Sequence, residues 1–110
     1  MKIILRKSKF PANPEIFLRR ANYAYIYDRR AGHGSFVRRL SGGHYPRFHL
    51  YVEEEGEFLV FNLHLDQQKE TVSFINSRHK GEYDGPAVEA EVARLKGLIR
   101  SEMEGMNFFK

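Results

Sequence analysis

Polar residues able to bind a metal or transfer a proton recur at alternate positions in VFNLHLDQ, residues 60–67. Alternate residues of an extended chain point to opposite faces, so the two leucines share one face and Asn62, His64 and Asp66 share the other. Upstream, RFHLYVE places His49 between apolar residues in the same alternating pattern. This spacing indicates either a polar sheet face exposed to water or a chemical site.

Two imidazoles and a carboxylate on neighbouring strands match a Zn²⁺, Mn²⁺ or Fe²⁺ site in which three protein ligands leave a position open to water. The loop SRHKGEYDG could fold over this face and contribute a further ligand. The candidate ligands are His49, His64, Asp66, His79 and Glu82. A divalent metal would lower the pKa of its bound water toward about 7 and could support hydrolysis of a phosphodiester or similar bond.

The same loop contains Tyr83, in GEYDG. Paired ligands on a strand with a tyrosine downstream faintly resemble the His-hydrophobic-His endonucleases of replication initiators and relaxases, which place paired histidines on a strand and a tyrosine on a helix. Here Asp66 stands in place of the second histidine, and Tyr83 precedes the helix. The resemblance implies catalytic roles for His49, His64, Asp66 and Tyr83, with the tyrosine attacking a phosphodiester.

Basic residues are concentrated in the first part of the chain, where residues 1–47 hold eleven Lys and Arg against two acidic residues. Residues 48–110 hold seven against twelve. Clustered Arg and Lys displace counterions from phosphates, so the asymmetry favours a polyanion-binding face; internal pairing of the two halves is the alternative.

Tyrosines beside arginines on a sheet could stack bases and hold phosphates, which favours a small nucleic-acid-binding module, RNA ahead of DNA. This interface would comprise Arg29, Arg30, Arg38, Arg39, Arg47, Tyr45 and Tyr51. Tyr23, Tyr25 and Tyr27 alternate along another strand and would either extend this platform or face the core. A third interpretation is a structural protein whose exposed sheet face is covered by a partner or by a second copy.

A β-hairpin must position these residues, with RFHLYVE and FLVFNLHLD joined by Glu-Glu-Gly-Glu. With Glu55-Gly56 as the turn, Phe48 faces Leu63 and every inward pair is apolar, as expected where one sheet face is buried. The other face would then pair Tyr45 with Asp66, Arg47 with His64, His49 with Asn62 and Tyr51 with Val60.

The remaining pattern predicts an α+β fold: an antiparallel sheet of four to six strands, a short N-terminal helix, and a long C-terminal helix packed on one face. Further strands are expected near the N-terminus and at residues 23–28, 35–40 and 71–76. Asn13-Pro14 predicts the start of the short helix, and Gly85-Pro86 the start of the long one. The long helix carries an apolar stripe at Val88, Val92, Leu95, Ile99 and Met103.

The whole chain fits a single domain spanning residues 1–110, because so short a chain supports one core. It contains no cysteine, which excludes disulfides and thiolate chemistry, and its serines carry no nucleophile motif. The apolar runs are too short for a membrane span or a signal peptide, so we expect a cytoplasmic protein. Between residues 45 and 86, the segments YPRFHLYV, NLHLDQ and GEYDGP resemble small uncharacterised bacterial proteins of candidate-phylum genomes. That resemblance implies a bacterial protein and no established activity.

Overall fold

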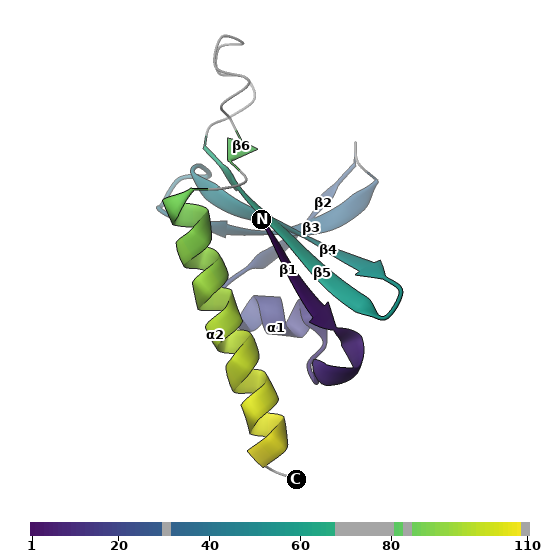
Figure 1. Cartoon of the computed structure of the whole chain (residues 1–110). Helices are drawn as coiled ribbons and strands as arrows, with labels where there is room; N and C mark the ends of the chain where they lie inside the picture. Colours follow the sequence, from purple (N-terminus) through teal and green to yellow (C-terminus); the bar gives the residue numbers. More distant parts are fainter. Residues whose placement is uncertain (30–31, 68–80, 83–84, 109–110) are drawn as a thin grey trace.

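An antiparallel sheet with two helices forms the fold, seen in a computed structural model that describes residues 1–29, 32–67, 81–82 and 85–108 (Figure 1). The elements are β1 (Lys2–Arg6), the 3-10 helix η1 (Lys7–Lys9), α1 (Pro14–Arg20), β2 (Ala24–Asp28), β3 (His33–Arg39), β4 (Arg47–Glu55), β5 (Phe58–Asp66), β6 (Gly81–Glu82) and α2 (Pro86–Phe108). The strand order is β1-β5-β4-β3-β2, and the short β6 also pairs with β5. The predicted α+β class is therefore confirmed.

Both helices begin where the sequence predicts. The Oδ1 of Asn13 accepts hydrogen bonds from the backbone N–H groups of Glu15 at 2.9 Å and Ile16 at 3.3 Å, and Pro14 occupies the first helical position. Pro86 opens α2 in the same way. Neither described helix is long and apolar enough to cross a membrane.

The core lies between the helices and one face of the sheet, which we call the inner face. In Figure 1, α2 runs along the sheet with α1 beside it. The apolar stripe of α2 packs into this core, with Val88, Val92, Leu95 and Ile99 buried and Met103 at its margin. The inner face contributes Phe48, Leu50, Leu59, Phe61, Leu63 and Leu65. The predicted helix stripe and the predicted apolar face are both confirmed.

The β4–β5 turn is one residue later than predicted. Glu55 pairs with Phe58, so the turn residues are Gly56 and Glu57 rather than Glu55 and Gly56. Gly56 has φ of 62°, the left-handed conformation that the first central position of a two-residue hairpin turn requires. A glycine adopts this conformation without the steric cost that a glutamate would incur.

This later turn moves every cross-strand pair by two residues. Phe48 lies opposite Leu65 instead of Leu63, and His49 lies opposite His64 instead of Asn62. The other predicted polar pairs are corrected likewise: Arg47 lies opposite Asp66, and Tyr51 opposite Asn62. Because side chains alternate with a period of two, a two-residue shift leaves each residue on its predicted face.

Other boundaries differ by small amounts or lie outside the described residues. The first strand ends at Arg6, where η1 begins, and the predicted hairpin at 23–28 and 35–40 is observed as β2 and β3. The strand predicted at 71–76 lies outside the described residues. The expected loop at 77–85 contains the two-residue strand β6.

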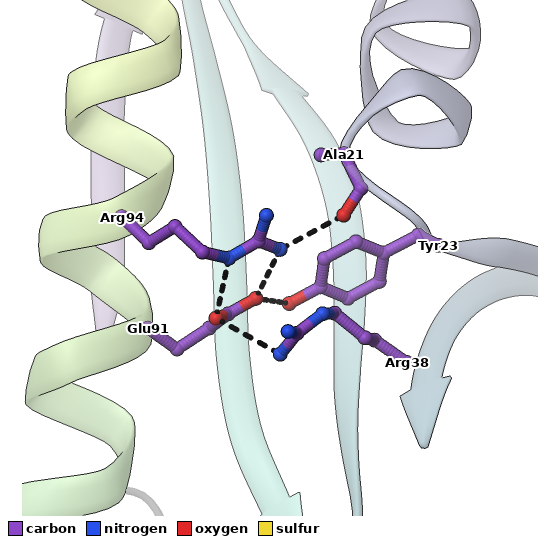
Figure 2. A network of polar contacts seen from close by, with 5 residues as sticks. All are labelled: Ala21, Tyr23, Arg38, Glu91 and Arg94. Atoms are coloured by element: carbon purple, nitrogen blue, oxygen red, sulfur yellow. Dashed lines mark hydrogen bonds and ion pairs between the residues drawn. The ribbon is translucent and has the colours of Figure 1, made fainter. Parts of the chain in front are cut away.

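A buried carboxylate connects α2 to the sheet and to the end of α1 (Figure 2). The side chain of Glu91 is only 3% exposed. Its Oε2 accepts hydrogen bonds from the hydroxyl of Tyr23 at 2.6 Å and from Nη2 of Arg94 at 2.8 Å. Its Oε1 accepts from Nε of Arg94 at 2.9 Å and from Nη1 of Arg38 at 3.3 Å. Arg94 also donates to the carbonyl of Ala21 at 2.8 Å, so a single carboxylate joins α2, α1, β2 and β3.

Burial, together with the hydrogen bond to Glu91 and its negative charge, raises the pKa of Tyr23 far above the ordinary value for tyrosine. The phenol therefore remains a protonated donor to Glu91 at neutral pH. Both oxygens of the buried Glu91 carboxylate have donors, while Arg38 and Arg94 remain partly exposed to water, which makes this buried charge tolerable.

We predict that Glu91→Ala lowers the free energy of unfolding by about 3–5 kcal/mol, because it leaves Arg38 and Arg94 without their carboxylate partner. Glu102→Ala, on the same helix, removes an exposed pair with Arg20 and should cost less than about 1 kcal/mol. Urea denaturation followed by circular dichroism measures both. Equal losses in the two variants would contradict the structural role assigned to Glu91.

Candidate functional site

The candidate site lies on the outer face of the sheet, opposite the core. His49 on β4 and His64 on β5 are direct cross-strand partners, and Asp66 lies two residues beyond His64 on the same face. Each histidine is only 8% exposed, so this part of the outer face is not the wet surface that an open antiparallel sheet would present.

Asp66 joins the two imidazoles through its two carboxylate oxygens. Oδ2 lies 3.1 Å from Nδ1 of His49, and Oδ1 lies 3.0 Å from Nε2 of His64. Nε of Arg47 lies 3.4 Å from Oδ2, as their direct opposition across the strands allows. The carboxylate is thus surrounded by three potential donors while its side chain stays 19% exposed.

The environment of Asp66 keeps it ionised. Burial alone would raise the pKa of this carboxyl group, but the hydrogen bonds and charges of His49 and His64 outweigh burial and hold the pKa well below its usual range. Asp66 is therefore a carboxylate at neutral pH and an available oxygen ligand.

Ser35 supports this group from the neighbouring strand β3. Its Oγ lies 2.7 Å from Nε2 of His49, and Ser35 is 1% exposed. Both ring nitrogens of His49 are therefore engaged, one by a serine hydroxyl and one by a carboxylate. Because the hydroxyl is buried, the geometry assigns it to orienting the imidazole rather than to attacking a substrate.

Aromatic packing further restricts the two imidazoles. The Tyr51 ring stacks on His49 with centroids 4.7 Å apart and on His64 at 5.8 Å. The centroids of the His49 and His64 rings are 5.0 Å apart. The His33 ring packs edge-on against Tyr51, with their centroids 5.4 Å apart. Rings fixed in this way lose little rotational freedom on binding a ligand.

Among the predicted metal ligands that the structure describes, His49, His64 and Asp66 come together. Donor atoms of His49, His64 and Asp66 all lie within 4.8 Å of one another. Glu82 pairs with Leu65 rather than with Asp66, and His79 and Tyr83 lie outside the described residues. Donor atoms about 2.1 Å from a tetrahedral metal are about 3.4 Å apart, so side-chain movements of about 1 Å would complete the geometry.

The predicted nucleic-acid residues are divided between the two sheet faces. Arg38 points inward to Glu91, whereas Arg39 is exposed and lies opposite Arg47 on the outer face. The guanidinium of Arg47 lies 4.7 Å from the centroid of Tyr45. Tyr51 is half-buried on the outer face, Arg29 is exposed, and Arg30 lies outside the described residues.

The tyrosines in β2 and immediately before it do not extend an outer platform. Tyr23 is buried in the core, and Tyr25 pairs with Phe36 on the inner face. Tyr27 lies on the same side as Tyr25, and both are partly exposed at the sheet edge.

Two groups of functional interest could not be found from the sequence. Ser35 lies two residues before Val37 on the same face of β3, and Val37 is the direct cross-strand partner of His49. The contact therefore depends on the β3–β4 register, which joins two separate hairpins. Glu91 lies within an apparently ordinary amphipathic helix, and its partners Tyr23 and Arg38 are more than fifty residues away.

The chain matches no family model, no curated protein and no solved structure, so its function is argued from this geometry alone.

Proposed function

We propose that this protein binds a divalent transition metal through His49, His64 and Asp66 and hydrolyses a phosphodiester-type bond. The observation that supports this proposal is the bridging position of the Asp66 carboxylate between two buried imidazoles, each stacked on Tyr51. Two histidines and a carboxylate with positions left open are the ligand set of many catalytic Zn²⁺, Mn²⁺ and Fe²⁺ sites.

Each ligand would change its hydrogen-bond partner on metal binding. His49 and His64 would give up the protons that now connect them to Asp66, and the freed nitrogens and carboxylate oxygen would face the ion. Nε2 of His49 would donate to Ser35 Oγ, the kind of outer hydrogen bond that fixes the tautomer and direction of a ligating imidazole. A bound metal supplies an activated water near neutral pH.

Arg47 could bind the substrate beside this site. Its side chain is 18% exposed and extends over the Tyr45 ring. Two neutral histidines and one carboxylate leave a divalent ion with a net positive charge, and Arg47 adds a second positive charge nearby. A phosphate anion is the substrate chemistry that such a field attracts.

Single-stranded RNA binding is a second candidate, favoured by one specific observation. Arg39 and Arg47 are direct cross-strand partners, an arrangement of like charges that is unfavourable without an anion nearby. Asp66 is near Arg47 but is already shared with two histidines. A phosphate next to Arg39, with a base stacked on Tyr45, would relieve the repulsion.

We predict that the wild-type protein binds a single Zn²⁺ or Mn²⁺ ion per chain in isothermal titration calorimetry. His49→Ala and Asp66→Ala should abolish binding, and Ser35→Ala should weaken it about 10–100-fold because it removes only the orienting hydrogen bond. His44→Ala, in an exposed turn, is the control and should bind as the wild type does. Wild-type affinity in the His49→Ala variant would rule out this site.

A second prediction concerns hydrolysis of bis(p-nitrophenyl) phosphate by the metal-loaded protein. We expect a metal-dependent rate that Asp66→Ala abolishes. Arg47→Ala should raise KM about tenfold while leaving metal affinity unchanged, because it removes a charge-assisted contact to phosphate. Arg29→Ala serves as the charge-matched control. Metal binding without any hydrolysis would support the metal site but contradict the proposed hydrolase activity.

For the RNA candidate, filter binding of a single-stranded RNA across a salt series should give a negative slope of log affinity against log salt. Arg39→Ala should reduce that slope by about 0.7, the value for one phosphate contact on a single strand. Arg19→Ala, whose guanidinium is paired with Glu15 on α1, should leave the slope unchanged. Absence of binding at low salt would eliminate this candidate.

A further inference from the structure

The outer edge of β1 has backbone groups that pair with none of the described strands. Among the described strands, β1 pairs only with β5, so it forms one end of the sheet (Figure 1). Met1 and Leu63 exchange both of their backbone hydrogen bonds, at 2.9 and 2.8 Å, and the N–H of Lys7 donates to the carbonyl of Glu57. Hydrogen-bonded pairs alternate along an antiparallel ladder, so the N–H and C=O groups of Lys2, Ile4 and Arg6 point away from β5.

A groove of about 640 Å³ lies between this edge and the C-terminal half of α2. It is lined by the β1 residues Lys2, Ile4 and Leu5 and by the α2 residues Lys96, Arg100 and Met103. Leu5 lies on the inner face, opposite Leu59, whereas Lys2 and Ile4 lie opposite Asn62 and Val60 on the outer face. Ile4 is 62% exposed, unusual for a large apolar residue on a strand. Within the described part of the chain, none of the three cations has an ion-pair partner, whereas Arg6 is paired with Glu57.

We propose that this groove binds an extended, acidic segment of a partner protein, which adds to the sheet as a strand beside β1. The outward backbone groups of β1 would supply the main-chain hydrogen bonds of such β-augmentation. Side chains of an added strand alternate between the two sheet faces. Those on the inner side would contact Leu5 and Met103 and lie near Lys96 and Arg100, and those on the outer side would contact Ile4 and lie near Lys2. Glu104 also lines the groove, and its negative charge would repel an acidic segment.

Charge argues against a second copy of the chain as the occupant. Antiparallel self-pairing centred on Ile4 would place Lys2 of one copy directly opposite Arg6 of the other, twice in each dimer. Like charges directly opposite across strands are destabilising. Lysine on an edge strand is a common means by which proteins resist self-association, and the same charge attracts an acidic strand.

The probe is a fluorescently labelled, end-capped peptide of alternating glutamate and valine, about seven residues long to match a typical strand. Fluorescence anisotropy should show saturable binding to the wild-type protein and no binding of the corresponding lysine and valine peptide. Ile4→Pro removes one outward N–H at an edge position that tolerates proline, and should weaken binding about tenfold. Ile4→Thr keeps that N–H and the branched side chain, and is the matched control.

Lys96→Glu, on the exposed surface of α2, reverses one groove charge without altering β1 and should also weaken binding. Circular dichroism confirms that each variant is folded. Failure of the acidic peptide to bind the wild type would overturn the proposal, as would equal binding of both peptides or unchanged binding by a folded Ile4→Pro variant. Dimerisation of the wild type that Ile4→Pro abolishes would also overturn it, because a second copy would then occupy the edge.

Discussion

Burial of the inner face of β4 and β5 beneath the helices is the constraint that positions the outer face. Leu50, Phe61 and Leu63 are fully buried there. Each such side chain contributes about 1.5–3 kcal/mol through its removal from water, whereas a typical hydrogen bond contributes about 0.5–1.5 kcal/mol net. A slip of one residue would expose the whole apolar set, so the core holds the strands in place more strongly than the polar contacts between His49, His64 and Asp66 do.

Glu91 and Asp66, on the two sides of the sheet, have different surroundings, and this difference separates a structural role from a chemical one. Glu91 on the inner side is held by two arginines and a tyrosine whose pKa is raised, so every partner is a fixed donor. Asp66 on the outer side is held mainly by two imidazoles, whose ring nitrogens are also metal ligands. A metal ion can replace protons on imidazoles but cannot do so on guanidinium groups. The outer cluster is therefore the one suited to binding a cation.

The sequence predicted the fold class, both helix starts and the face of every β4 and β5 residue, because apolar periodicity and capping residues are local signals. It placed the hairpin turn one residue early, since both candidate turns contain Gly56 and flanking glutamates do not distinguish them. The direct opposition of His49 and His64 depended on that single residue. Ser35 and Glu91 acquire their partners from strands and helices distant in the chain, and no local pattern encodes such contacts.

The charge asymmetry along the chain is partly compensated by contacts between its halves. Arg6, Lys7, Arg20, Arg38 and Arg47 of the basic half each pair with an acidic residue of the other half. Net charge alone is therefore a poor guide to a polyanion surface here. Cations without an ion-pair partner among the described residues indicate an anion site better than net charge does. Lys2, Lys96 and Arg100 border the groove at the β1 edge. Arg39 lies opposite Arg47 on the outer face. The first group has apolar neighbours at Leu5 and Met103, which suits the proposed acidic strand. Arg39 has Arg47 and the Tyr45 ring nearby, which suits the proposed phosphate and base contact.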